Sequence, residues 1–226
     1  MFADRSQAGR ILGRLVADQV HHSPLVVLAL PRGGVPVAFE VARCLEATVD
    51  FDVFLVRKLG VPDREELAFG AIATGGVRVL NREIIEQLEV PDDIIEQVAR
   101  RQQLELERRE RAYRQARPPI DLRNRVVILV DDGLATGATM IAAIDAVRLH
   151  EPARIVVAVP VASRQTCEQL RSMADQVICA ETHDPFFAVG YWYRDFEQIS
   201  DAQVRTLLRQ FTPAHSTPGA RDPHVS

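Results

Sequence analysis

The sequence has few cysteines and no long apolar run, and each shortage excludes a class of protein. Cys44, Cys167 and Cys179 are odd in number, widely spaced and embedded in apolar patterns, which argues against a disulfide framework or a zinc site. The apolar runs fall far short of the roughly 20 residues that span a bilayer. Because the first residues are polar and acidic, unlike the apolar centre of a signal peptide, we expect a cytoplasmic protein without a membrane segment.

The chain also lacks a strong excess of charge of one sign. Its 226 residues include 27 Lys and Arg against 31 Asp and Glu, for a formal net charge of −4. This balance offers no basic face to a nucleic-acid backbone, so no polymeric nucleic acid is expected as a partner. The apolar fraction of 47% is that of an ordinary globular protein with room for a full α/β core.

The most informative stretch is residues 126–140, VVILVDDGLATGATM. Its first five residues are apolar and mostly β-branched, which is typical of a parallel strand buried on both faces. Asp131 and Asp132 follow at the carboxyl end of that strand, where open α/β sheets bind ligands. The small residues of 133–139 let backbone N–H groups approach a phosphate at the start of the next helix. Because carboxylates repel phosphate, we expect them to bind nearby sugar hydroxyls, so the implied ligand is a sugar phosphate.

Two common phosphate motifs are excluded at this loop. A Walker A loop needs a lysine after its last glycine, and here Gly137 is followed by Ala138 and Thr139. The dinucleotide fingerprint needs glycines directly after the strand, with the acidic residue about 20 positions later instead of in front. The stretch instead resembles the motif with which type I phosphoribosyltransferases bind 5-phosphoribosyl-1-diphosphate (PRPP): an apolar strand, two acidic residues and a loop ending in Thr-Gly-x-Thr.

The resemblance implies an activity and a role for each residue of the motif. Asp131 and Asp132 would contact the ribose hydroxyls, and the 5-phosphate would lie against the loop residues Ala135, Thr136, Gly137, Ala138 and Thr139. The implied reaction transfers the 5-phosphoribosyl group from PRPP to a nitrogenous base-like acceptor and releases diphosphate. Mg²⁺ is the implied cofactor, held mainly by PRPP and water without direct protein ligands. The plainer alternative is a strand-to-helix turn with two surface aspartates.

A second candidate loop, residues 31–34, lies between a predicted buried strand at 25–30 and a predicted helix at 35–45. Gly33 and Gly34 allow backbone geometries closed to other residues, and Arg32 carries a guanidinium suited to bidentate phosphate contact. Alone, Arg-Gly-Gly is more often just a tight turn. By resemblance it is the diphosphate loop of the family, in which the Arg32–Gly33 peptide bond would be cis.

A third predicted strand, residues 49–56, ends in Arg57 and Lys58, and the sequence after it loses periodicity. By resemblance, the loop at 59–68 is flexible and closes over PRPP, with Arg57 and Lys58 reaching the diphosphate. A hairpin is predicted beyond it, with strands at 68–73 and 77–80.

The acceptor is the least explicit part of the sequence. Ala135 occupies the position at which the 6-oxopurine branch of the family has a proton-handling aspartate, so we expect hypoxanthine and guanine to be poor acceptors. In the adenine branch an acidic residue of the flexible loop does that work. Glu65 and Glu66 are therefore the catalytic candidates, together with Lys58.

Helices are predicted at 81–88 and 92–117 from apolar spacing and from opposite charges four residues apart. They interrupt the alternation of strands and helices, so we place 82–117 outside the core as an inserted helical hairpin, as a hood or as the contact of a possible homodimer. A strand, a helix and a strand that extend the sheet are predicted at 154–161, 164–173 and 176–180.

Aromatic residues concentrate near the C-terminus, in a predicted hood at 181–211. Phe187 and Trp192 are candidates for stacking on a base, although a capping mini-core is as good an interpretation. Residues 212–226 are predicted to be disordered. The predicted fold class is thus α/β: a doubly wound, mainly parallel sheet flanked by helices, forming a single domain over residues 1–211 with the inserted hairpin and the hood.

A rival function from another class is a non-catalytic regulatory protein that binds PRPP as an effector. Such regulators usually add a DNA-binding domain, and the sequence shows neither a helix-turn-helix pattern nor a basic stripe. The expected small-molecule partners are therefore PRPP and a base acceptor.

Overall fold

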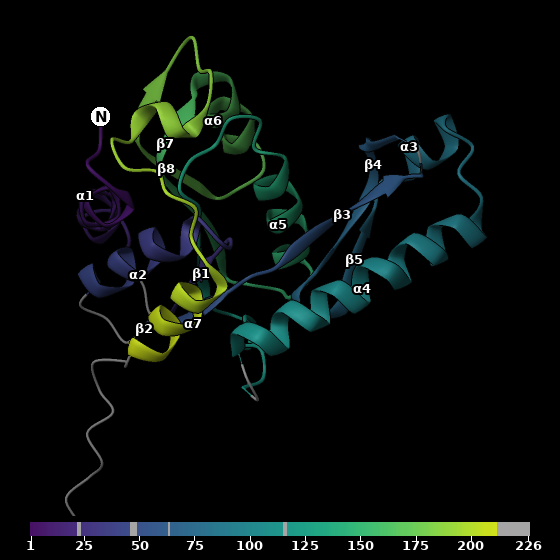
Figure 1. Cartoon of the computed structure of the whole chain (residues 1–226), viewed down its shortest axis with the longest axis horizontal. Coiled ribbons are helices and arrows are strands. Elements are labelled where there is room, and N and C mark those ends of the chain that lie inside the picture. Colours follow the sequence, from purple (N-terminus) through teal and green to yellow (C-terminus); the bar gives the residue numbers. More distant parts are fainter. Residues whose placement is uncertain (22–23, 46–48, 63, 115–116, 212–226) are drawn as a thin grey trace, which may run out of the picture.

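The computed structural model describes residues 1–21, 24–45, 49–62, 64–114 and 117–211, apart from the side chains of residues 65 and 66. The tail at 212–226 lies outside the described residues, so its disorder stays a prediction. Figure 1 shows an α/β body and, beside it, an arm made of three strands and one long helix. No helix among the described residues combines the length and the apolar character that crossing a membrane requires.

The body is built on a five-stranded sheet of order β2-β1-β6-β7-β8, in which all neighbouring strands are parallel. Every residue of β1 and β6 is buried, which is why both strands are continuous apolar runs in the sequence. The predicted doubly wound, mainly parallel α/β sheet is confirmed. The strands are β1 (Leu25–Ala29), β2 (Val49–Val53), β6 (Val126–Val130), β7 (Arg154–Ser163) and β8 (Gln176–His183).

Helices cover both faces of this sheet. One buried cluster joins the face of β1 that carries Val27 to α1 (Arg5–Ala17), α2 (Gly34–Cys44) and α7 (Asp201–Gln210). A second cluster joins the opposite face, which carries Leu28, to α5 (Ala138–Arg148) and α6 (Arg164–Arg171). From β1 the chain continues to β2 on one side, whereas β6 lies on the other side of β1. Strand order therefore reverses between β1 and β6, and such a switch point is where α/β sheets open a crevice for ligands.

The arm contains an antiparallel sheet of order β3-β4-β5, with β3 (Val56–Val61), β4 (Arg64–Ala73) and β5 (Val77–Leu80). The hairpin predicted between 68–73 and 77–80 is confirmed. The expectation of an irregular loop at 59–68 was wrong, because the described residues there pair as β3 and β4. Register shifts on both sides of Gly60 break the alternation from which strands are predicted. Arg57 and Lys58 consequently lie within β3, and do not end the preceding strand.

The predicted inserted helices are α3 (Arg82–Gln87) and α4 (Asp92–Arg114), but α4 does not lie outside the core. It packs along β3 and against α7, and its residues Ile95, Ala99, Leu106 and Tyr113 belong to the main buried cluster. These apolar residues form a narrow stripe on a helix that is otherwise charged. The expected position outside the core was inferred from the interrupted alternation of strands and helices, whereas the spacing of a few apolar residues fixes α4 against the body.

Candidate functional site

The acidic pair stands at the carboxyl end of β6, at the switch point of the sheet. The backbone N–H of Asp132 donates to Oδ1 of Asp131 over 2.8 Å, which fixes the turn between the two residues. Burial raises the pKa of Asp131 well above its usual range, and the charge of Asp132 raises it further. Burial also raises the pKa of Asp132. A pair of desolvated carboxylates favours partners that donate hydrogen bonds, as sugar hydroxyls do.

Arg5, which the sequence analysis missed, binds this pair from α1. Its Nε donates to Oδ2 of Asp132 over 2.8 Å, and its Nη1 donates to the carbonyl oxygen of Glu197 over 2.8 Å. The guanidinium lies 3.8 Å from the ring centroid of Phe196. The hydroxyl of Tyr193 donates to the carbonyl oxygen of Asp132. These residues come from the two ends of the chain, and no local pattern marks an arginine in the first turn of a helix as buried.

The loop after β1 lies directly against the acidic pair. A Cβ atom on Gly33 would stand 1.9 Å from Oδ2 of Asp132, and one on Gly34 would stand 2.8 Å from the carbonyl oxygen of Val130. Only glycine fits where the two loops approach this closely. The structure thus brings together the predicted acidic pair and the predicted diphosphate loop.

The cis peptide bond of this loop joins Pro31 and Arg32, so its predicted position at Arg32–Gly33 was wrong by one bond. Gly33 instead has helical torsion angles and serves as the N-cap residue of α2. Nη1 of Arg32 lies 3.8 Å from Oδ1 of Asp201, the first residue of α7. The hydroxyl of Tyr113 on α4 donates to the same oxygen over 2.8 Å. Asp201 of α7 therefore links Arg32 of the diphosphate loop to Tyr113 of α4.

The loop between β6 and α5 has the form expected of a phosphate site. Gly137 is the N-cap residue of α5 and adopts a left-handed conformation with φ of 68°. Because glycine has no side chain to cap the helix, the first N–H groups of α5 can bind an anion. The carbonyl oxygen of Ala135 accepts a 2.6 Å hydrogen bond from the hydroxyl of Thr166, which holds the loop against α6.

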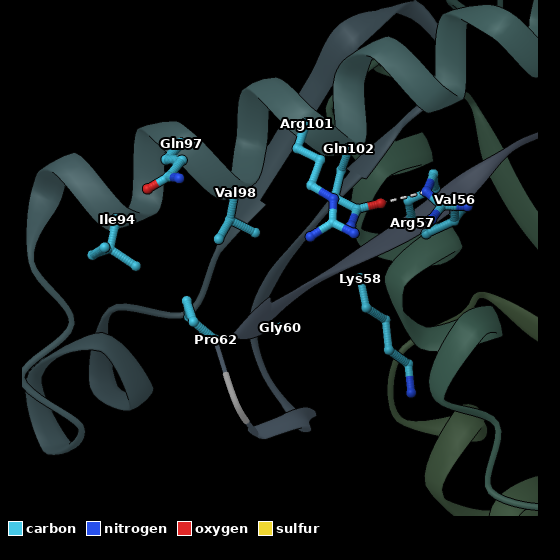
Figure 2. Close-up of a pocket in the computed structure, with 10 residues that line it drawn as sticks. All are labelled: Val56, Arg57, Lys58, Gly60, Pro62, Ile94, Gln97, Val98, Arg101 and Gln102. Carbon is cyan, nitrogen blue, oxygen red and sulfur yellow. Dashed lines mark hydrogen bonds between the residues drawn. The ribbon is translucent and has the colours of Figure 1, made fainter.

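Arg57 and Lys58 point to opposite faces of β3 (Figure 2). Nε of Arg57 donates to Oε1 of Gln102 on α4, and both residues line a cavity of about 510 Å³ between β3 and α4. Lys58 also lines this cavity, and it borders a second cavity of about 740 Å³ together with Ala138 at the start of α5. The two basic side chains point to opposite faces of the strand but border the same first cavity, so their joint contact with the diphosphate stays a prediction.

The remaining predicted site residues are Glu65, Glu66, Phe187 and Trp192. Glu65 and Glu66 belong to β4, and their side chains are outside the described residues, so their catalytic role stays a prediction. Phe187 is 77% exposed. Trp192 stacks on His183, with ring centroids 3.4 Å apart and an angle of 11° between the rings. One face of Trp192 is therefore already covered, as in the mini-core alternative, whereas Phe187 is accessible.

Comparison with known proteins identifies the family. A family model described as phosphoribosyl transferase domain matches residues 62–195. The chain therefore belongs to the phosphoribosyl transferase family, a class of glycosyltransferases, and the predicted resemblance is confirmed. This match begins after β3 and includes β4, β5, α4 and the acidic pair.

Individual relatives agree with this family. Two proteins of Mycobacterium tuberculosis, from strains CDC 1551 and H37Rv, both bear the name "Putative phosphoribosyl transferase" and are 45% identical over 227 residues. The alignments cover 99% of this chain and 51% of each relative, so the chain spans about half the length of these proteins. The crystal structure of the protein TT1426 from Thermus thermophilus is 43% identical, with a TM-score of 0.81 over 92% of this chain and 97% of that chain.

Proposed function

We propose that this protein transfers the 5-phosphoribosyl group of PRPP to a nitrogenous base acceptor and releases diphosphate. The observation that carries the proposal is the contact between two loops at the switch point of the sheet, where Gly33 lies against Asp132. One loop offers two carboxylates and a free helix N-terminus, and the other offers Arg32. This combination suits a ligand with hydroxyls between two phosphate groups.

The reaction breaks the bond between the anomeric carbon and the diphosphate oxygen and forms a bond from that carbon to a ring nitrogen of the base. Positive charge develops on the ribose in the transition state, and negative charge moves to the leaving diphosphate. Arg32 stabilises the leaving group, and the amides of 135–139 hold the 5-phosphate. The proton of the base nitrogen goes to a carboxylate, for which Glu65 and Glu66 are our candidates.

The free carboxylate oxygens of the acidic pair fit the ligand preference of Mg²⁺. Oδ1 of Asp131 accepts the N–H of Asp132, and Oδ2 of Asp132 accepts Nε of Arg5. The other oxygen of each carboxylate is a hard donor of the kind that Mg²⁺ or its bound water prefers. We infer that PRPP and water would supply most ligands of a bound Mg²⁺, and that the ion would add positive charge that stabilises the leaving diphosphate.

Diphosphate release from PRPP, measured over a panel of purines, pyrimidines and pyridine carboxylates, tests the proposed activity. We expect turnover with one acceptor class and weak activity with hypoxanthine and guanine, because Ala135 carries no acid or base. Glu65→Gln and Glu66→Gln are then assayed on the acceptor that responds. Full kcat in both variants would exclude these carboxylates as proton acceptors.

Calorimetric titration with PRPP tests the binding site separately. Asp132→Asn keeps the shape but removes a charged acceptor, so we expect PRPP affinity to fall by about 1.5–3 kcal/mol. Tight PRPP binding without turnover on any acceptor would favour the rival function, a PRPP-sensing regulatory protein. A cytoplasmic location and a homodimer stay predictions from the sequence.

A further inference from the structure

Helix α4 brings an arginine beside both phosphate loops. A small cavity of about 30 Å³ is bordered by Pro31 of the diphosphate loop and by Thr139 of the loop after β6. Arg57 of β3 and Arg109 of α4 border the same cavity. Arg109 lies in the segment 82–117 that was expected outside the core, and its position next to the loops follows from the buried stripe of α4.

Both arginines have N–H groups that can still donate hydrogen bonds to a ligand. Nε of Arg109 donates to Oε1 of Glu105 over 2.9 Å, and Nε of Arg57 donates to Gln102. Within the part of the chain that the structure describes, the terminal nitrogens of these two guanidinium groups have no hydrogen-bond partner. A guanidinium presents these nitrogens in a fork that matches phosphate oxygens.

The surroundings carry more positive than negative charge. Glu105 is shared between Arg109 and Arg108, so one carboxylate serves two guanidinium groups. Burial lowers the pKa of Arg57, and repulsion from neighbouring arginines, first of all Arg109, lowers it further. Crowded like charges of this kind are relieved when an anion binds between them.

The same end of α4 is linked to the diphosphate loop through Asp201 of α7. Tyr113, four residues after Arg109, donates to Asp201, and Arg32 lies 3.8 Å from that carboxylate. Burial raises the pKa of Tyr113 to about 12, while the charges of Arg109 and Arg32 lower it, so both guanidinium groups lie near the same hydroxyl.

We propose that Arg109 of α4, together with Arg57, binds the diphosphate of PRPP in addition to Arg32. This inference rests on the proposed function and assigns α4 a part in it. The helix completes the site that binds PRPP, the phosphoribosyl donor. On this assignment the two arginines act on the diphosphate, while the acidic pair holds the ribose and the amides of 135–139 hold the 5-phosphate.

Calorimetry with three ligands tests the assignment in the presence of Mg²⁺: PRPP, inorganic diphosphate and ribose 5-phosphate. For Arg109→Gln we expect PRPP and diphosphate affinity to fall by roughly 10- to 100-fold, while the affinity for ribose 5-phosphate is unchanged. The matched control is Arg111→Gln, because Arg111 pairs with Glu107 four residues earlier, as Arg109 pairs with Glu105, but faces solvent. We expect this control to bind all three ligands like the wild type.

The possible failures are distinguishable. If the wild type binds neither PRPP nor ribose 5-phosphate, the proposed function fails. If the wild type binds PRPP and Arg109→Gln binds it equally well, the role of Arg109 is overturned while the function stands. An equal loss for all three ligands, with a lower unfolding temperature, would show that Arg109 only supports the fold. Arg109→Lys, which keeps the charge but not the fork, should bind diphosphate with intermediate affinity.

Discussion

At the scale of a single residue, the buried carboxylate of Asp131 suits ligand binding but lowers the stability of the ligand-free fold. Its carboxylate is desolvated beside a second carboxylate, and both effects raise its pKa in the folded protein. A carboxyl group with a raised folded pKa destabilises the fold as pH rises above its unfolded value, because ionising the group costs more in the folded state than in the unfolded state. The ligand-free protein therefore carries a cost at neutral pH that bound hydroxyls would offset.

We predict that Asp131→Asn stabilises the ligand-free protein at pH 7 and weakens its affinity for PRPP. The amide keeps an oxygen for the N–H of Asp132 but has no charge to desolvate. Because the ordinary pKa of aspartate is about 3.9, the gain should shrink as pH falls toward 4. Urea unfolding at several pH values measures the effect. A variant less stable than the wild type at pH 7 would contradict this account.

Arg5 is predicted to set the pH range in which the site binds PRPP. Its guanidinium lowers the pKa of Asp132 against the effect of burial, so Arg5→Gln should raise that pKa further. A protonated Asp132 accepts hydrogen bonds poorly, so affinity is lost as pH falls through its pKa. In Arg5→Gln this loss should begin at a higher pH than in the wild type, in calorimetric titrations between about pH 5 and 8.

Arg10→Gln is the control for Arg5, because Arg10 lies on the same helix and pairs with Glu40 at the surface. This variant should show the pH profile of the wild type. An unchanged profile in Arg5→Gln would mean that Arg5 serves the fold alone.

At the scale of an element, we derive a prediction for Gly33 from the close contact between the diphosphate loop, which follows β1, and the loop that follows β6. Its torsion angles, φ of −61° and ψ of −35°, are open to alanine, so only the contact with Asp132 opposes a side chain. Gly33→Ala must displace that carboxylate, and we expect PRPP affinity to fall by roughly tenfold or more. Calorimetry measures the affinity, and thermal unfolding reports the state of the fold. Unaltered PRPP binding would show that the two loops separate at no cost.

The elements of the sheet could be predicted from the sequence because their signals are local. Strands β1 and β6 are apolar runs, and the residues that follow each run, Arg32 to Gly34 and Asp131 to Thr139, meet because parallel strands present their carboxyl ends at one edge. The pairing between β3 and β4 was missed because its register shifts around Gly60. These shifts interrupt the alternation of apolar and polar residues from which strands are predicted. Such irregularity is invisible until the partner strand is known.

Contacts between distant elements could not be predicted. Arg5 reaches Asp132 across 127 positions of the chain, and Arg109 meets Thr139 only because α4 packs along β3. Nothing in the neighbouring residues of either arginine distinguishes it from the solvent-facing arginines of the same helix. The loop residues of the site could thus be predicted from the sequence. The groups that orient the acidic pair and extend the diphosphate site could be identified only from the folded structure.

At the scale of the whole molecule, one buried ion pair attaches the arm to the body. Nε of Arg114, at the end of α4, donates to Oδ2 of Asp52 on β2 over 2.7 Å, and the two side chains are 4% and 7% exposed. Another nitrogen of Arg114 donates to the carbonyl oxygen of Val53 over 2.7 Å. Burial raises the pKa of Asp52, against the lowering effect of Arg114. The pair therefore fixes α4, and with it Arg109, relative to the five-stranded sheet.

We predict that Arg114→Met lowers the free energy of unfolding by about 3–5 kcal/mol at pH 7, because the buried Asp52 carboxylate loses its ion-pair partner and keeps the hydrogen bond from the N–H of Val53. Removing the guanidinium raises the folded pKa of Asp52 further, so the deficit should shrink as pH falls and the carboxyl becomes protonated. Asp52→Asn in the same chain removes the charge and should recover part of the loss. Urea unfolding of the single and double variants measures both effects.

The control for this pair is Arg123→Met, which breaks an ion pair at the surface. The side chains of Arg123 and Glu151 are 67% and 70% exposed. Arg123→Met should lower the free energy of unfolding by no more than about 1 kcal/mol. Because the Arg114 pair positions α4, Arg114→Met should also weaken inorganic diphosphate binding more than ribose 5-phosphate binding, as Arg109→Gln does. If Arg114→Met lost stability but kept the diphosphate affinity of the wild type, α4 would hold its position by the buried stripe of apolar residues alone, and the ion pair would serve stability without serving the site.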